Sequence, residues 1–141
     1  GISLMTNRTR ICAKDVMKTG YGTIDRGATI KETLNEMDRL KTNVLVVNKR
    51  DEHDEYGLIM SSDIAQQVLA KDRAPSRVNV YEIMTKPVVC VPPDMDIRYC
   101  SRLMSSLNLP RILVVMNREL LGTVSPNALV LKSLTASEVS D

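Results

Sequence analysis

The chain carries one pattern twice. Each copy opens on a β-branched residue followed by methionine, Val16-Met17 in the first copy and Ile83-Met84 in the second. A helix-like stretch, an apolar run, a polar turn and a short segment that begins with Gly57 or Gly122 then follow. About 60 residues bury too little surface to be comfortably stable alone, so each copy is predicted to need the other as a partner. The cleft between the copies is therefore the first place to look for function.

The spacing between matching residues shows where the copies differ. It is 67 residues between Met17 and Met84, 68 across the apolar runs 44–47 and 112–115, and 65 between the two glycines. The first copy therefore has the longer polar turn. On this spacing, Val46 and Val114 are expected at equivalent buried positions of the two sheets.

Local patterns predict helices and strands within each copy. Thr29 and Glu32 form a capping-box sequence, and apolar residues then recur at helical spacing from Ile30 to position 40. In the second copy, Asp94 or Asp96 can cap a less regular helix. The apolar runs are too short for helices and are typical of buried strands. Each copy thus mixes helices and strands.

The composition argues against several classes of protein. Nineteen basic and seventeen acidic side chains leave a net charge of +2, and Trp and Phe are absent, which disfavours a nucleic-acid-binding protein. No apolar stretch approaches the roughly 20 residues that cross a bilayer, and no signal-peptide core is evident, so we expect no membrane partner and a cytoplasmic location. Three cysteines without a Cys-x-x-Cys pair indicate buried thiols.

The chemical groups of the chain are poorly suited to catalysis. The only histidine, His53, lies in the acidic turn 49–56 without a placed partner. We expect this turn to be solvated, and a metal ion there is disfavoured because the spacing of a calcium loop is absent. The phosphate-binding, nucleophile-elbow and zinc-protease motifs are also absent. We therefore expect neither an enzyme nor a required metal or cofactor.

The junctions between the last strand and the closing helix are more informative. The segment 57–63 runs from a buried strand into a helix start, where backbone N–H groups favour anionic or hydroxyl-rich ligands. Asp63 could accept two hydrogen bonds from a ribose diol, or Ser61, Ser62 or Asp63 could simply cap the helix. In the second copy, Ser125-Pro126 fits a helix cap followed by proline at least as well as a ligand contact.

Taken together, these features resemble the cystathionine-β-synthase (CBS) domain family, which occurs as tandem pairs called Bateman modules. The resemblance spans residues 12–135 and is carried by Asp15-Val16-Met17, the segment 81–88, the two apolar runs and the Gly57 to Asp63 junction. It implies an α+β fold with units at 12–71 and 78–135. Each unit would be β-α-β-β-α, and the two would pack by their sheets around a pseudo-two-fold axis. Such pairs commonly dimerise, so a homodimer is expected.

The resemblance also implies a ligand class, because these pairs often bind AMP, ADP, ATP or S-adenosylmethionine to regulate an attached or associated protein. The family motif is Gly-h-x-(Thr/Ser)-x-x-Asp, with the aspartate on the ribose hydroxyls. The first copy keeps Gly57 and Asp63 but has Met60 at the Thr/Ser position. The second keeps Gly122 and Ser125 but has Ala128 at the aspartate position.

The resemblance implies two clefts with walls from both copies. The first is expected to involve Asp63, Ser62, Met60, Ile59, Thr42, Asn43, Thr85, Pro87 and Val89. The second is expected to involve Lys18, Thr19, Tyr21, Thr23, Arg111, Val124 and Ser125. Arg111 occupies a place where family members often direct a basic side chain at phosphate, although a surface arginine fits equally well.

Two functional hypotheses follow from the residues and the resemblance. The first is a non-catalytic regulatory module that binds an adenine nucleotide mainly through Asp63 and signals to an effector protein. The alternative is a constitutive dimerisation or scaffolding module whose clefts are degenerate, since each cleft holds half of the motif.

Overall fold

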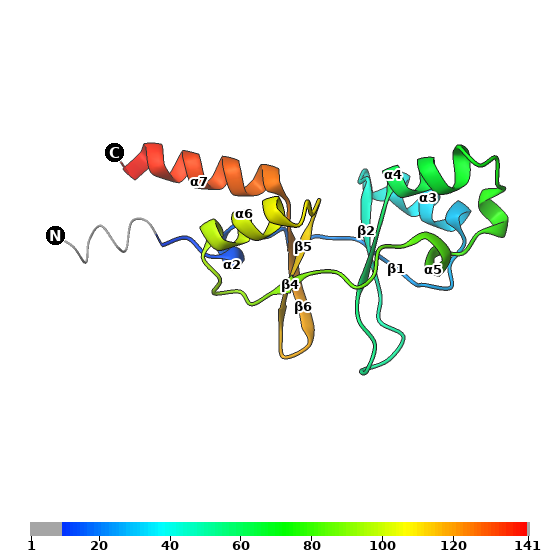
Figure 1. Ribbon diagram of the computed structural model, residues 1–141, viewed down its shortest axis with the longest axis horizontal. Helices are drawn as coiled ribbons and strands as arrows, with labels where there is room; N and C mark the ends of the chain where they lie inside the picture. Colours follow the sequence, from blue (N-terminus) through cyan, green and yellow to red (C-terminus); the bar gives the residue numbers. More distant parts are fainter. Residues whose placement is uncertain (1–9, 141) are drawn as a thin grey trace. The chain divides into compact units, whose positions relative to one another are not determined.

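The computed structural model describes residues 10–140, with side chains described as far as Ser133. The chain forms two compact units (Figure 1). One unit is the continuous segment Tyr21–Val88, and the other combines the residues up to Gly20 with those from Val89 onward. Each unit has its own three-stranded sheet and its own cluster of buried apolar side chains. The expected α+β class is confirmed.

The unit Tyr21–Val88 contains one mixed sheet in the order β1-β2-β3, with β1 parallel and β3 antiparallel to β2. Its core joins Ile30 and Met37 of a long helix to Leu45, Val47 and Ile59 of the sheet. The elements are β1 (Thr23–Ile24), α3 (Ile30–Leu40), β2 (Val44–Val47), β3 (Gly57–Met60), α4 (Ser61–Ile64), the π-helix η1 (Ala65–Leu69), the 3-10 helix η2 (Pro75–Arg77) and α5 (Val80–Ile83).

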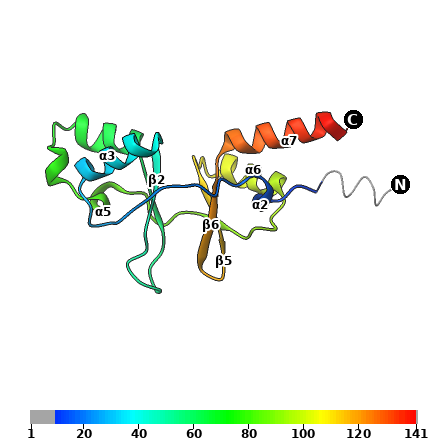
Figure 2. The ribbon, with the colours of Figure 1, turned by 180° about the vertical axis from the view of Figure 1, so that it is seen from behind.

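The other unit repeats this topology with the sheet order β4-β5-β6. Its two longer helices cover one face of the sheet, where Cys100 and Met104 meet Val114 and Leu129 in one cluster (Figure 2). The elements are α2 (Ala13–Val16), β4 (Cys90–Val91), α6 (Ile97–Ser106), β5 (Ile112–Met116), β6 (Glu119–Val124) and α7 (Pro126–Ser140). Both units therefore show the predicted β-α-β-β-α order.

The predicted helix starts agree with the observed caps. The Thr29 hydroxyl accepts a hydrogen bond from the Glu32 N–H at 3.1 Å, and the Glu32 carboxylate accepts one from the Thr29 N–H at 3.5 Å. In the other unit Asp96 is the cap, because its carboxylate accepts a hydrogen bond from the Arg98 N–H at 2.7 Å. Of the two aspartates that the sequence offered, Asp96 rather than Asp94 caps α6.

The short opening helix of each copy packs within the unit that holds the other copy's sheet. Lys18, just after α2, exchanges two backbone hydrogen bonds with Thr123 of β6, at 2.8 and 3.0 Å. Thr85, just after α5, does the same with Leu58 of β3, at 2.8 and 2.9 Å. The compact units therefore cut across the sequence repeat, in which one copy follows the other.

The two glycines explain this arrangement at the atomic level. A Cβ placed at Gly122 would lie 2.8 Å from the Met17 sulfur, and one placed at Gly57 would lie 3.1 Å from the Met84 sulfur. Only a residue without a side chain lets the methionine approach the strand this closely. The Val/Ile-Met openings and the strand glycines, which the sequence shows separately, are thus contact partners.

The expected equivalence of Val46 and Val114 is wrong by one residue. Val47 lies opposite Gly57 and Val114 lies opposite Gly122, so Val114 corresponds to Val47 with a spacing of 67. The apolar run of the first copy starts one residue earlier, at Val44, where the second copy has Arg111. The first residues of the two runs, Val44 and Ile112, are therefore not equivalent positions of the two strands. Val46 and Val114 are nevertheless both buried, at 1% and 0% exposure.

Across residues 10–140, no helix is long and apolar enough to cross a membrane. Of the three cysteines, Cys12 and Cys100 are buried as expected, whereas Cys90 is exposed at the start of β4. The expectation of three buried thiols is therefore wrong for Cys90, because neighbouring strand residues point to opposite faces and Val91 points into the core.

Candidate functional site

Asp63 lies where β3 passes directly into α4. Its Oδ2 atom accepts a hydrogen bond from the backbone N–H of Met60 at 2.9 Å, so the carboxylate caps the helix. The side chain is half-buried, and within residues 10–133 its Oδ1 atom has no hydrogen-bond partner. The capping interpretation is thus confirmed for one oxygen, while the second oxygen can still accept hydrogen bonds from a ligand.

The same capping contact occurs at two other short helices. The Asp15 carboxylate accepts a hydrogen bond from the Cys12 N–H at 2.8 Å, and the Glu82 carboxylate accepts one from the Asn79 N–H at 2.7 Å. Hydrogen bonding to Asn79 is also the main reason that the pKa of Glu82 lies below its usual value. Asp15 is an exposed residue and the Glu82 side chain is 31% exposed, whereas Asp63 is half-buried at the end of a core strand. A carboxylate cap alone is therefore a structural device of this fold.

The residues before β2 lie beside this junction. The Ser61 N–H donates a hydrogen bond to the Asn43 carbonyl at 2.9 Å, and Val44 pairs with Met60. The Thr42 hydroxyl donates to the Val44 carbonyl at 3.1 Å. Predicted site residues from two segments about 20 residues apart are therefore brought together at one end of the sheet: Thr42, Asn43, Met60, Ser62 and Asp63.

Ile59 is correctly placed in sequence but its side chain is not available to a ligand. It is fully buried among Ile30, Leu45 and Val68 in the apolar cluster of its unit. Strand alternation explains this, because neighbouring residues of β3 point to opposite faces. Ile59 thus packs in the core next to the junction and does not contact a ligand.

Thr85 and Pro87 belong to the same unit, and both are exposed. Thr85 is paired with Leu58, two residues before Met60 on β3. Val89 belongs to the other unit, where its carbonyl accepts a hydrogen bond from the Leu113 N–H at 3.0 Å. The structure therefore gathers every member of the predicted Asp63 set except Val89 into one compact unit.

The second predicted set is also divided between the units. Lys18, Thr19, Arg111, Val124 and Ser125 lie in the unit of β4–β6, whereas Tyr21 and Thr23 lie in the other. Burial raises the pKa of Tyr21, and the neighbouring Tyr56 raises it further.

Within the unit of β4–β6, two polar members of this set, Arg111 and Ser125, already have local partners. The Ser125 hydroxyl accepts a hydrogen bond from the Ala128 N–H at 3.2 Å, which confirms its role as a helix cap. The Arg111 guanidinium donates to the Pro110 carbonyl at 2.8 Å. Val124 is fully buried in the core. The aspartate position is filled by Ala128, so no carboxylate stands here.

The acidic turn between β2 and β3 departs from the sequence expectation. The Asp54 side chain is only 7% exposed and forms an ion pair with Lys86, whereas His53 is exposed as expected. Hydrogen bonds from Lys86 and from the backbone of Arg50 hold the pKa of Asp54 well below its usual range. The expectation of a wholly solvated turn is wrong for this residue. Local sequence gives no signal of the contact, since the two residues are far apart in the chain.

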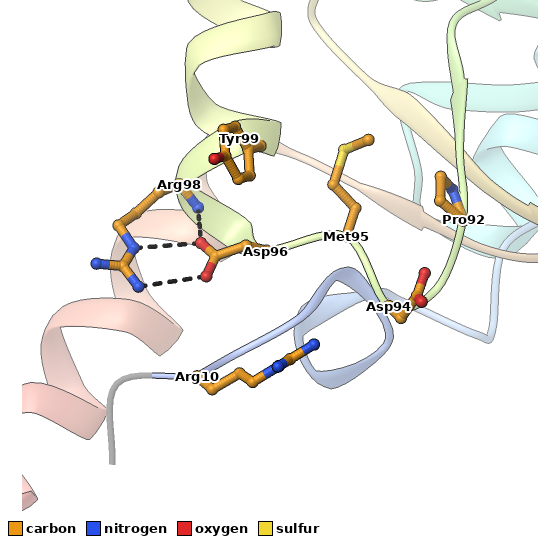
Figure 3. Close-up of a pocket in the computed structure, with 7 residues that line it drawn as sticks. All are labelled: Arg10, Pro92, Asp94, Met95, Asp96, Arg98 and Tyr99. Atoms are coloured by element: carbon orange, nitrogen blue, oxygen red, sulfur yellow. Dashed lines mark hydrogen bonds and ion pairs between the residues drawn. The ribbon is translucent and has the colours of Figure 1, made fainter. Parts of the chain in front are cut away.

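A separate open pocket of about 450 Å³ lies at the start of α6 (Figure 3). Its lining contains none of the predicted site residues and consists of Arg10, Pro92, Asp94, Met95, Asp96, Arg98 and Tyr99. The Arg98 guanidinium contacts both oxygens of Asp96 at 3.2 Å, and this lowers the pKa of Asp96 (Figure 3). Of the two arginines that line the pocket, Arg98 is therefore already paired with a carboxylate. In the part of the chain with described positions, no group of three or more His, Cys, Asp or Glu could hold a metal ion.

The comparison with protein families gives a match at both copies. The profile of the CBS domain matches residues 13–70 and 80–134. Among curated proteins, an uncharacterized protein of Methanopyrus kandleri is 31% identical over 84 residues, which are 59% of this chain and 42% of that protein. The chain thus spans less than half the length of this relative.

Solved structures with the same fold include CBS-domain proteins of different sources. A hexameric CBS-CP12 protein from bloom-forming cyanobacteria has a TM-score of 0.82 and 33% identity, covering 87% of this chain and 72% of that one. A conserved CBS domain protein of unknown function from Thermoplasma acidophilum has a TM-score of 0.76 and 22% identity, covering 92% and 75%. The second likeness shows the fold alone.

Proposed function

Because this chain belongs to the CBS-domain family, whose members are generally non-catalytic regulatory modules, we propose that it senses an adenine nucleotide and signals to an effector protein. AMP, ADP, ATP and S-adenosylmethionine are the candidate ligands. The ligand is a regulatory one, so no cofactor is required for folding. The effector is either a separate protein or part of a longer chain.

The observation that carries this proposal is the second oxygen of Asp63. One oxygen is held by the Met60 N–H, which fixes the orientation of the carboxylate, and the other has no partner among the described side chains and backbone groups. A carboxylate oriented in this way is suited to accept hydrogen bonds from a ribose diol, and charge-assisted bonds of this kind are the stronger ones. The adjacent residues Thr42, Asn43 and Ser62 add polar groups at the same end of the sheet.

The direct test is calorimetry of AMP and ATP binding to the parent protein and to Asp63→Ala. Loss of hydrogen bonds to a charged group, worth about 1.5–3 kcal/mol, should weaken binding by roughly 10- to 150-fold. Asp15→Ala is the matched control, because it removes the same kind of helix cap at a carboxylate outside the proposed site. Each variant should lose only about 1 kcal/mol of stability as a cap. Equal nucleotide affinity in the parent and Asp63→Ala would refute the proposal.

The second copy offers a gain-of-function test. Ala128→Asp restores a carboxylate at the position equivalent to Asp63, with Ser125 already present beside it. We expect this variant to bind AMP more tightly than the parent, or with a second site. A thermal-shift panel provides an independent measurement, since a ligand at 100 times its Kd stabilises a folded protein by about 2.7 kcal/mol.

A scaffolding role is the second candidate function, and self-association is common to both. Each copy holds only half of the nucleotide motif, which favours a scaffold. The chain also exposes large apolar side chains on its closing helices, Leu69 in one unit and Val130 and Leu131 in the other. Exposed apolar surface of this kind is typical of an interface. The hexameric CBS-CP12 protein supports assembly of this chain into a homodimer or a larger oligomer.

A further inference from the structure

The long turn of the first copy is attached to the segment that follows α5. The Asp54 carboxylate accepts a hydrogen bond from the Lys86 ammonium and a second one from the Arg50 backbone N–H at 2.8 Å. The Asp54 side chain is 7% exposed and that of Lys86 is 26% exposed, so the carboxylate is shielded while the lysine keeps partial contact with water. Removing the lysine would leave the shielded carboxylate without its cation.

Lys86 lies between two predicted site residues, Thr85 and Pro87. Thr85 is joined to β3 by an isolated bridge to Leu58, with hydrogen bonds of 2.8 and 2.9 Å, and not by a ladder of several residues. Met84, the residue before Thr85, also packs against Gly57 of β3. The ion pair with Asp54 adds a contact on the other side of the bridge, after Thr85.

The unit of β4–β6 does not contain this contact. Lys18 is bridged to Thr123 in the same way as Thr85 to Leu58. The residue after Lys18 is Thr19, however, whereas the residue after Thr85 is Lys86. The corresponding turn is reduced to Asn117 and Arg118, both with positive φ, and neither residue has a carboxylate. The ion pair therefore occurs in the unit that contains the motif aspartate, Asp63.

We propose that the Asp54–Lys86 ion pair is a positioning element that fixes the segment around Lys86 beside Gly57 and Leu58, at the start of β3, and thereby positions Thr85 and Pro87. The long acidic turn thereby has a role in placing two of the predicted site residues. The inference rests on the proposed function, because the position of Thr85 and Pro87 affects a ligand only if an adenine nucleotide reaches from the Asp63 junction to this segment. Asp54 and Lys86 act through these neighbours and need not touch the ligand.

Hydrogen exchange of the Thr85 and Leu58 amides tests the positioning without any ligand. In Asp54→Asn and in Lys86→Met, exchange at Thr85 should accelerate by at least about tenfold, the effect of losing a hydrogen bond to a charged group. The double variant should show little more than either single change, because both remove one interaction. Lys86→Arg keeps the charge and should remain close to the parent. Asp38→Asn is the matched control, since Asp38 is 84% exposed in its pair with Lys41.

Calorimetry with AMP on the same variants tests the link to the site. Weaker AMP binding in Asp54→Asn and Lys86→Met, but not in Asp38→Asn or Lys86→Arg, would support the inference. Unchanged exchange at Thr85 in Asp54→Asn would overturn the positioning role itself. Accelerated exchange with unchanged AMP affinity would overturn its connection to the site. A parent protein that binds no adenine nucleotide would refute the proposed function, while the exchange data would still decide whether the ion pair orders the segment.

Discussion

Replacing Gly122 by alanine should destabilise the protein, because a Cβ at this position meets the segment that follows α2. The added carbon would lie 2.8 Å from the Met17 Sδ atom and 2.9 Å from the Lys18 carbonyl oxygen. The methionine side chain can move, but the Lys18 backbone is fixed by its two hydrogen bonds to Thr123. Relief of the contact therefore requires a shift of the backbone.

The expected magnitude follows from two opposing effects. Overpacking of this kind costs about 1–3 kcal/mol, whereas replacing glycine by alanine stabilises by about 0.4–1 kcal/mol through the unfolded chain. The net loss should be about 1–2 kcal/mol, which lowers the Tm of a chain of this length by about 2–8 °C. Gly57→Ala should cost less, because its nearest contacts are both at 3.1 Å.

Thermal and urea denaturation of Gly122→Ala and of a control, Gly20→Ala, provide the assay. No atom lies within 4 Å of a Cβ at Gly20, and its φ is not positive, so this change should be neutral or slightly stabilising. Adding Met17→Ala to Gly122→Ala removes the contact with the sulfur but not the contact with the Lys18 carbonyl oxygen, so the second change should not fully restore stability. If Gly122→Ala were as stable as Gly20→Ala, the assignment of α2 to the unit of β4–β6 would be wrong.

Three further outcomes are expected. Val46→Asp should prevent folding, because it places an unpaired charge in an apolar interior, and a cooperative unfolding transition of this variant would contradict the burial of Val46. In the native protein, iodoacetamide should modify Cys90 well before Cys100, because Cys100 is buried and burial raises its pKa; mass spectrometry showing equal rates would contradict this. Sedimentation at micromolar concentration should show a dimer or larger species, and a monomer alone would count against the proposed self-association.

The elements of this fold follow from short-range sequence patterns. The capping box at Thr29 starts α3, and the apolar runs form β2 and β5, because helix caps and strand burial depend on residues close together in the chain. The Gly57 to Asp63 segment is predicted from the same kind of short-range pattern. Its residues follow one another along a strand and a helix, so their spacing in the sequence determines where Asp63 lies relative to Gly57.

The partners of these elements were decided by tertiary structure. Val16-Met17 and Ile83-Met84 are nearly interchangeable as sequences, and only packing assigns Met17 to Gly122 and Met84 to Gly57. The sequence does not give the register of β2, because the first residue of an apolar run does not mark a strand position, whereas pairing with Gly57 does. The ion pair of Asp54 with Lys86 is absent from the sequence pattern for a related reason. A charge in a polar turn is expected to be solvated, and only the folded chain brings a distant lysine to Asp54 and shields its carboxylate.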